Sequence, residues 1–325
     1  MQTNMKINFF PNIRKKENIE NEFSSENQDN CNKIKEKCIN YKEFSNSLIK
    51  TTKKYNHNTK YITQGCCQID NTTLLTYYES RNIFHFNKKK RNNNNSILEV
   101  LDEYGHNKNL IFDNFSHVGG IAYSKIFNKI YVTRYRARKN SQATISCYDL
   151  KTITSAKDNT ILDNYQIIKL PESSHVSYLT IDNDLLYIGD FRKNLLVVYK
   201  IIDKGLSVEY YKTYKLNFNK VQGMCTFNYK NNKYYAFSCS YGRNKDSILR
   251  ITKLINNNFV LLYSYKLPCM SEQISIDSDG NLMIVFESDS IKYSQGLDNI
   301  LRKKASTIID SVCHIDINKL FTSNE

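Results

Sequence analysis

Five copies of one sequence phrase, about fifty residues apart, constrain most strongly what this chain can fold into. Each copy begins with a polar residue that opens a short segment of alternating apolar residues. The copies are TQG (63–65), SHVGGIAY (116–123), SHVSYLTI (174–181), VQGMCTF (221–227) and SEQISID (271–277). Their second residues are Gln64, His117, His175, Gln222 and Glu272, at intervals of 53, 58, 47 and 50 residues. The phrase therefore marks a repeated structural unit.

Each repeat contains further strand-like segments. A second segment follows the phrase at 73–79, 128–135, 184–190, 233–241 and 282–288. A third lies at 96–102, 143–150, 195–201, 247–254 and 310–317, and a fourth at 109–114, 165–170, 210–216 and 261–267. These runs are short, β-branched or aromatic, and bounded by Asn, Asp, Gly or Ser, as strands are. Four strands per repeat is the unit of a β-propeller blade.

The fifth repeat has no fourth segment of its own, but a candidate stands before the first repeat, at SLIKTTKKY (47–55). An N-terminal strand that completes the last blade would account for both facts and would leave no exposed sheet edge at the join. We therefore predict an all-β fold: a five-bladed β-propeller with four-stranded blades, closed where 47–55 meets 310–317. The alternatives are a sixth blade hidden in residues 1–46 and a β-sandwich with coincidental spacing.

The predicted domain boundary lies at residue 46. Residues 1–46 are charged and lack alternation, so we expect an arm that is poorly ordered or helical, and residues 47–325 form the propeller domain. The chain carries a formal charge of +14, but its Lys and Arg are spread along its length, with the densest clusters at 88–91 and 302–304. That spread favours a solvated surface over a nucleic-acid footprint.

The sequence contains no apolar stretch long enough to cross a bilayer, and its first residues lack the pattern of a secretory signal. The nine Cys are an odd number without zinc or redox spacing, which indicates reduced thiols. We expect a cytoplasmic monomer whose partner is a small polar molecule, and neither a membrane nor a nucleic acid.

The five phrase residues should form one ring, because the first strand of each propeller blade lines the central channel. One interpretation is a ligand site at the mouth of this channel. The other is a ring that only satisfies the hydrogen bonds of the channel wall.

A second set of polar residues stands where the second strands end. Glu79, Asp190 and Glu287 follow Gln64, His175 and Glu272 by fifteen residues each. The other two blades carry Arg134 with Tyr135, and Ser240, Tyr241 and Arg243, at the matching place. Charges of both signs at convergent strand ends are typical of a site for a polar ligand. Ordinary turn residues are the alternative.

The two histidines share the flank Ser-His-Val. His117 and His175, with Glu79 or Asp190, offer donors that a divalent cation in the channel would accept. Both could equally be neutral, hydrogen-bonded wall residues. We predict no other cofactor.

Two phrases resemble the glutamine cyclotransferases of plants and bacteria. Thr63-Gln64-Gly65 followed by Glu79-Ser80 is similar to the first part of that family's pattern, and SYGRNKDSILR (240–250) is similar to a later part. Arg81-Asn82 stand where the family has Thr-Gly, the later part falls in the fourth repeat rather than the first, and the chain has no Trp for the family's tryptophan-rich pocket. The HVGGIAY and FES phrases also resemble uncharacterised bacterial propellers. The resemblance implies a five-bladed propeller and closure of N-terminal glutamine to pyroglutamate, with a channel carboxylate moving the proton.

Three functions follow from these features. The first is a module that binds a small polar or anionic ligand, with Arg134 and Arg243 holding its negative group. The second is an enzyme in which Glu79 or Glu287 is the general base, for glutamine cyclisation or for hydrolase or lyase chemistry. The third is a platform for protein interactions. The sequence leaves open whether the protein is a catalyst.

Overall fold

The computed structural model describes residues 7, 9–10, 17–80, 95–113, 116–134, 142–297 and 303–322, with backbone only for 17–24. The basic cluster at 88–91, Tyr135 and Arg81-Asn82 lie outside the described residues. So does part of the cluster at 302–304.

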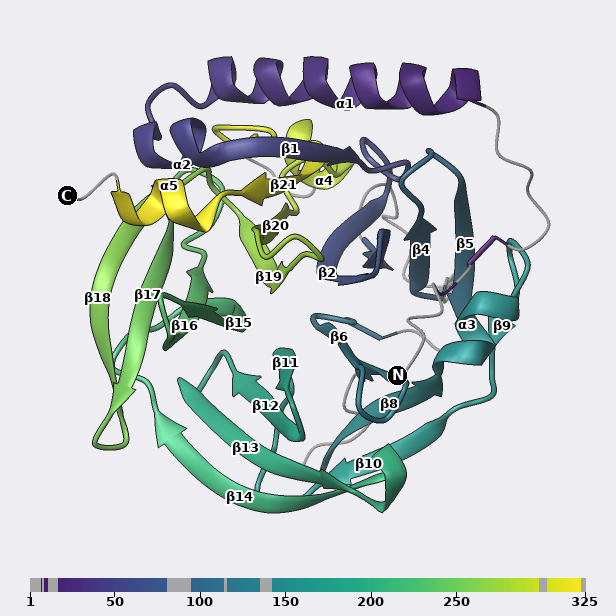
Figure 1. Ribbon diagram of the computed structural model, residues 1–325, viewed down its shortest axis with the longest axis vertical. Coiled ribbons are helices and arrows are strands. Elements are labelled where there is room, and N and C mark those ends of the chain that lie inside the picture. Colours follow the sequence, from purple (N-terminus) through teal and green to yellow (C-terminus); the bar gives the residue numbers. More distant parts are fainter. Residues whose placement is uncertain are drawn as a thin grey trace.

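Five antiparallel sheets surround a central axis like the blades of a propeller, with β2, β6, β11, β15 and β19 innermost (Figure 1). Blade 1 consists of β2 (Tyr61–Ile69), β3 (Thr72–Glu79), β4 (Ile97–Leu101) and β5 (Asn107–Phe112). Blade 2 consists of β6 (Ile121–Ser124), β7 (Lys129–Thr133), β8 (Ala143–Asp149) and β10 (Gln166–Leu170). Blade 3 consists of β11 (Tyr178–Asp182), β12 (Leu185–Asp190), β13 (Leu195–Ile202) and β14 (Ser207–Lys215). Blade 4 consists of β15 (Val221–Tyr229), β16 (Asn232–Cys239), β17 (Ser247–Ile255) and β18 (Asn258–Leu267). Blade 5 consists of β19 (Ser271–Ile276), β20 (Leu282–Phe286), β21 (Ser311–Ile315) and β1 (Leu48–Lys53). The predicted five-bladed propeller is confirmed.

The connections between strands explain part of the unusual richness in Asn. Strands β15 and β16 are joined through Lys230 and Asn231, and β17 and β18 through Asn256 and Asn257, all four with positive φ. Two successive residues of positive φ are the signature of the tight hairpin turn that matches strand twist, and Asn tolerates this conformation well. The longer connection from blade 2 holds the helix α3 (Leu150–Ser155) and the strand β9 (Ile161–Leu162), which pairs in parallel with β5. Blade 1 therefore has a short fifth strand.

Strand β1 closes the ring by pairing antiparallel with β21, so that Thr51 faces Cys313 and Lys53 faces Ser311. This is the closure predicted from the missing fourth segment. A buried chain of polar groups fixes it: the Thr52 hydroxyl lies 3.0 Å from His314 Nε2, and His314 Nδ1 lies 2.8 Å from Asp277 Oδ2. Burial lowers the pKa of His314, so the neutral ring accepts from Thr52 and donates to Asp277.

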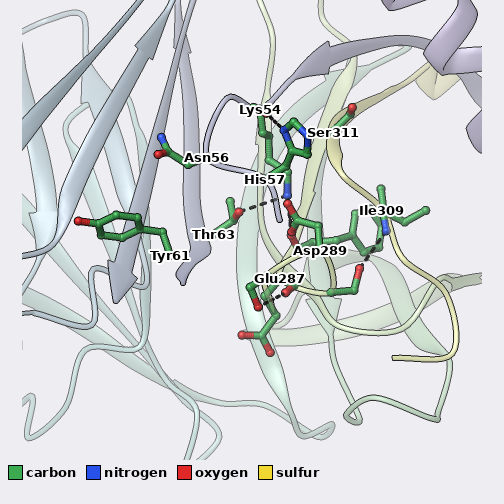
Figure 2. Close-up of polar contacts among 12 residues, drawn as sticks. Lys54, Asn56, His57, Tyr61, Thr63, Glu287, Asp289, Ile309 and Ser311 are labelled. Atoms are coloured by element: carbon green, nitrogen blue, oxygen red, sulfur yellow. Dashed lines mark hydrogen bonds and ion pairs between the residues drawn. The ribbon is translucent and has the colours of Figure 1, made fainter. Parts of the chain in front are cut away.

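A buried ion pair stands beside this chain. Lys54 is fully buried, and its Nζ lies 2.7 Å from Asp289 Oδ1, 3.0 Å from the Phe286 carbonyl oxygen and 3.2 Å from Thr63 Oγ1. Figure 2 shows Lys54 between Thr63 of blade 1 and Asp289, which follows the second strand of blade 5. One ammonium group thus joins the closing strand to both blades at the seam.

Helices α1 (Glu17–Lys37), α2 (Lys42–Ser47) and α5 (Ile317–Thr322) lie beside blade 5, with α1 running along the outside of β1 (Figure 1). Cys31, Ile34 and Cys38 of the α1 region are fully buried in the same apolar cluster as Cys313 of β21. Short helices η1 (Asp203–Gly205) and α4 (Ile291–Ser294) follow β13 and β20. In the part of the chain that the structure describes, no helix is long and apolar enough to cross a membrane. The domain boundary at residue 46 stays a prediction.

The inner strands approach one another closely at the axis because small residues leave room there. A Cβ atom on Gly65 would lie 2.8 Å from Gln273 Oε1, and one on Gly223 would lie 2.5 Å from Gln273 Cα. The buried Gln273 amide spans the axis: its Oε1 accepts from the Ile121 N–H at 2.9 Å, and its Nε2 donates to the Ile121 carbonyl oxygen at 2.7 Å. The glycine after each Gln anchor is therefore a requirement of packing around the axis.

All nine Cys are among the described residues, and each is free and buried. Burial raises the pKa of the Cys66 thiol to about 12 and that of Cys147 to about 11. The interpretation of the cysteines as reduced, structural side chains agrees with this arrangement.

We expect Thr52→Val to lower the free energy of unfolding by about 1–3 kcal/mol, because it leaves the buried Nε2 of His314 without its partner while keeping the shape of the side chain. Urea unfolding measures the change. Thr213→Val on the exposed face of β14 is the control and should change stability by less than about 0.5 kcal/mol. Equal effects of the two substitutions would contradict the role given to the Thr52–His314–Asp277 chain.

Candidate functional site

Propeller topology places the starts of the inner strands and the ends of the second strands on one face. Within the inner hairpins, Tyr61 pairs with Glu79, Tyr178 with Gly189, and Ser271 with Phe286. Glu79, Asp190 and Glu287 therefore emerge on the same side of the ring as the phrase residues.

Two glutamates of blade 5 form the centre of the candidate site. Glu272, near the start of β19, is 3% exposed, and Glu287, directly after β20, is partly buried. Their side chains are hydrogen-bonded to one another. Gln222 Nε2 donates to Glu272 Oε1 at 2.9 Å, and Gln64 Nε2 donates to Glu287 Oε2 at 3.3 Å. Two amides from blades 4 and 1 thus hold the two carboxyl groups in place.

The environment makes this pair hold a proton near neutral pH. Burial, and then the negative charge of Glu287, raise the pKa of Glu272 well above its ordinary value. Burial raises the pKa of Glu287 to about 7, against the lowering effects of Lys292, of the hydrogen bonds from Gln64 and Glu272, and of Arg243. Two carboxylates in contact cannot both ionise without a large cost, so one proton is shared between them.

Positive and aromatic groups surround the pair. The Arg243 Cζ atom lies 4.6 Å from the centroid of the Tyr293 ring, and Lys292 Nζ lies 4.9 Å from the same centroid. Arg243 Nη1 also donates to the Lys303 carbonyl oxygen at 2.9 Å. The guanidinium is therefore held against the Tyr293 ring and the Lys303 carbonyl group.

A tyrosine pair and a histidine complete the arrangement. Tyr293, on α4, is hydrogen-bonded to Tyr78 of β3, and its pKa is raised by burial and by the charge of Glu287. The Tyr78 ring stacks on the His117 ring with centroids 4.7 Å apart. Solvent reaches His117, yet the blades around it desolvate the ring and, with Lys292, lower its pKa to about 4. His117 is thus neutral at pH 7.

We call this group the axial site, and its members come from four blades and α4. They are Gln64, Tyr78, His117, Gln222, Arg243, Glu272, Glu287, Lys292 and Tyr293. Figure 2 shows Glu287 on the same segment as Asp289, with its carboxyl group directed away from Lys54.

Four other predicted site residues have partners outside the axial site. Glu79 Oε1 forms an ion pair with Lys60 Nζ at 2.5 Å. Arg134 donates to Ser146 Oγ at 3.1 Å and lies over the Tyr165 ring, among the outer strands of blade 2. Asp190 accepts from the backbone N–H of Arg192 at 2.9 Å, and its Oδ2 lies 3.8 Å from His175 Nδ1.

Tyr241 packs against the apolar layer between blades 3 and 4. His117 stacks on Tyr78, whereas His175 Nδ1 lies 3.2 Å from Ser174 Oγ and 3.8 Å from Asp190 Oδ2. Within the described ranges, no group of three or more His, Cys, Asp and Glu is arranged to hold a metal ion. A divalent cation in the channel stays a prediction.

The sequence patterns did not single out Tyr78, Lys292 or Tyr293. Tyr78 is hidden within an apolar strand, one residue before the strand-end carboxylate. Lys292 and Tyr293 belong to the helix α4, which has no counterpart in the described parts of the other repeats. The Ile291 N–H of this helix donates to the Thr59 carbonyl oxygen at 2.9 Å and so attaches the helix to blade 1. The phrase DSIKYSQG after FES was the available signal, because it breaks the strand pattern with a polar insertion.

No protein-family model matches the chain, and no curated protein matches it. Matches are found among solved structures. A luciferin-regenerating enzyme is 10% identical with a TM-score of 0.43, over 82% of this chain and 95% of the other. An α-L-arabinofuranosidase from Clostridium thermocellum is 11% identical with a TM-score of 0.45, over 78% and 88%. A chain of the nidogen/laminin complex is 13% identical with a TM-score of 0.40, over 60% and 67%. Likenesses this remote carry no argument about chemistry.

The shared proton makes stability depend on pH in a defined direction. The folded chain holds it more tightly than the unfolded chain, so its stabilising contribution is fully present below about pH 4.3 and is lost as the pH rises through about 7. In Glu287→Gln the part of this loss that belongs to Glu287 is removed, while buried Glu272 still contributes its own part, so the free energy of unfolding should fall less than in the wild type between about pH 5 and about pH 8.

Urea unfolding across that pH range, with Glu209→Gln on exposed β14 as the control, measures the difference. Parallel curves for wild type and Glu287→Gln would show that the pair is ionised like ordinary surface glutamates.

Proposed function

We propose that the protein is an enzyme that moves protons on a small zwitterionic or anionic substrate at the axial site, with Glu272 and Glu287 as its acid–base pair. The supporting observation is the hydrogen-bonded pair, in which the pKa of Glu287 is raised to about 7. A group that is half-protonated at working pH both accepts and returns a proton efficiently. Solvent reaches this region at His117 and Gln222, so a small molecule can approach it.

The remaining residues of the axial site would bind different parts of the substrate or position the two carboxyl groups. Arg243 and Lys292 place positive charge beside the pair and suit a carboxylate or phosphate group of the substrate. Neutral His117 offers one ring nitrogen as donor and the other as acceptor. Gln64 and Gln222 hold the carboxyl groups in register. This set replaces the earlier expectation for Glu79 and Arg134, which are engaged elsewhere.

The contact between the two carboxyl groups narrows the reaction class. Glycoside hydrolases of the usual kind hold their two carboxyl groups about 5–9.5 Å apart, to leave room for the sugar or a water. A hydrogen-bonded pair is too close for that arrangement. It suits proton transfer between nearby atoms of one substrate, in which one carboxyl group takes a proton and the other gives one.

Closure of N-terminal glutamine, the reaction implied by the TQG and SYGR phrases, fits this description. The α-amine loses a proton to Glu287 and its nitrogen bonds to the side-chain amide carbon. The C–N bond of the amide then breaks, and the leaving nitrogen takes a proton from the pair and departs as ammonia. Tyr78 and Tyr293 would form the aromatic wall that the chain cannot build from Trp. N-terminal glutamine as the substrate is part of what we propose.

One observation favours a different function. The outer strands β14 and β18 expose large apolar side chains, as a platform for protein interactions would: Tyr210, Tyr211, Val260, Leu261 and Leu262. This surface does not account for the proton-sharing pair, so we place the enzyme first.

Ammonia release from a glutaminyl peptide, and a thermal-shift screen against amino acids, lactones and phosphate esters, test the proposal. We expect Glu287→Gln to lower turnover about 10²–10⁴-fold while the ligand still raises the melting temperature. Glu172→Gln, an exposed carboxylate on a blade connection, is the matched control and should be unchanged.

A ligand that binds equally well to both variants without any turnover in the wild type would make the protein a binding module. Full turnover in Glu287→Gln would overturn the assigned role of the pair. The absence of both binding and turnover across the screen would count against a small polar substrate.

A further inference from the structure

A cavity of about 480 Å³ lies between the outer parts of blades 3 and 4, away from the axial site. It is bordered by the turn after β12, by the connection from β14 to β15, and by strands β17 and β18. The lining residues that bear on its chemistry are Asn194, Asn217, Phe218, Asn219, Arg250 and Leu261. None of them belongs to the axial site.

Arg250 is unusual for its position. It stands on β17 opposite Phe237 of β16, on the face that packs toward blade 3. That inter-blade layer is otherwise apolar and aromatic, with Leu216, Phe237 and Phe259 all buried in it. The Arg250 Cζ atom lies 5.4 Å from the centroid of the Phe218 ring, which in turn lies edge-on to Phe237 at 5.0 Å. Arg250 thus places a permanent charge in the otherwise apolar layer between blades 3 and 4.

The Arg250 guanidinium is hydrogen-bonded to the Cys239 thiol, but its hydrogen bonds are incomplete. Arg250 Nε is buried and has no hydrogen-bond partner among the described atoms. Leaving a charged donor buried and unpaired costs more free energy than leaving a neutral one. Arg250 also lines the cavity, which is the place from which an acceptor could reach the guanidinium. The Arg250 guanidinium therefore offers N–H donors to a ligand that carries oxygen acceptors.

We propose that this cavity is a second binding site, for a small anion that carries a carboxylate or phosphate group on an apolar body. Arginine presents parallel N–H groups that match two oxygens of such an anion. The side-chain amides of Asn194, Asn217 and Asn219 add donors, and Phe218 and Leu261 offer apolar contact. Lys193, Lys215 and Lys220 stand in the segments that border the cavity and give this part of the chain a positive charge.

This site is independent of the proposed function. It shares no residue with the Glu272–Glu287 pair, so an anion bound here acts as a separate ligand. The two oxygen groups, carboxylate and phosphate, are recognised by the same chemistry.

Calorimetric titration with phenyl phosphate, benzoate and inorganic phosphate tests the site. We expect phenyl phosphate or benzoate to bind the wild type more tightly than inorganic phosphate does, because of the apolar contacts. The comparison of phenyl phosphate with benzoate identifies the preferred anionic group. Arg250→Gln should weaken binding at least about tenfold.

Lys253→Gln is the matched control. It removes a positive charge from the same strand, but its side chain bonds Asn232 and lies over Tyr234, in the layer toward blade 5. It should leave anion affinity unchanged.

A second variant covers the case in which Arg250→Gln does not fold. Asn217→Asp adds a carboxylate to an exposed lining position, so it should weaken anion binding at least about tenfold without disturbing the blade. Wild-type affinity in both Arg250→Gln and Asn217→Asp, or no binding of any of the three anions to the wild type, would overturn the proposal.

Discussion

The pairing of β1 with β21 is the constraint on which the rest of the molecule depends. It joins the two ends of a ring that spans more than 250 residues, and the entropy of bringing such distant segments together opposes it. The seam lies within blade 5, and the hydrogen bond from Gln64 to Glu287 joins that blade to blade 1. The candidate acid–base pair therefore has its final geometry only in the closed ring. The Thr52–His314–Asp277 chain and the Lys54–Asp289 pair stabilise the same seam that positions the chemistry.

The axial site also shows how a propeller can tolerate buried charge. Glu272 is almost fully buried, and its protonation removes most of the cost of that position. Glu287 remains the group that can ionise, with Lys292 and Arg243 close enough to moderate its negative charge. Gln273, the next residue after Glu272, satisfies the backbone N–H and carbonyl groups of Ile121 in blade 2, across the axis. Two adjacent side chains of one strand thus serve the site and the scaffold separately.

Much of this could be predicted from the sequence, and the reasons for the remainder are physical. The period of the repeat fixed the number of blades, and the missing fourth segment fixed the closure. Inner strands converge at the axis, and in the structure Gln222 bonds Glu272 while Gln64 bonds Glu287, the partner of Glu272. The fifteen-residue offset placed Glu79, Asp190 and Glu287 at equivalent strand ends, but it could not tell where each side chain would turn. The Glu79 carboxylate forms an ion pair with Lys60, and the Asp190 carboxylate accepts a hydrogen bond from the backbone N–H of Arg192 after β12. Position along a strand is a repeated property, whereas the local partner is particular to each blade.

The nine thiols have a practical consequence. Each lies inside the folded chain and is free, and for those such as Cys66 and Cys147 burial also keeps the proton on sulfur at physiological pH. Electrophiles and oxidants attack thiolates, so the closed ring shields these residues from both. Once the ring opens, nine reactive sulfurs enter solvent together, and damage at any of them would hinder reclosure. The thiols are thus unreactive while the chain is folded and open to irreversible modification once it unfolds.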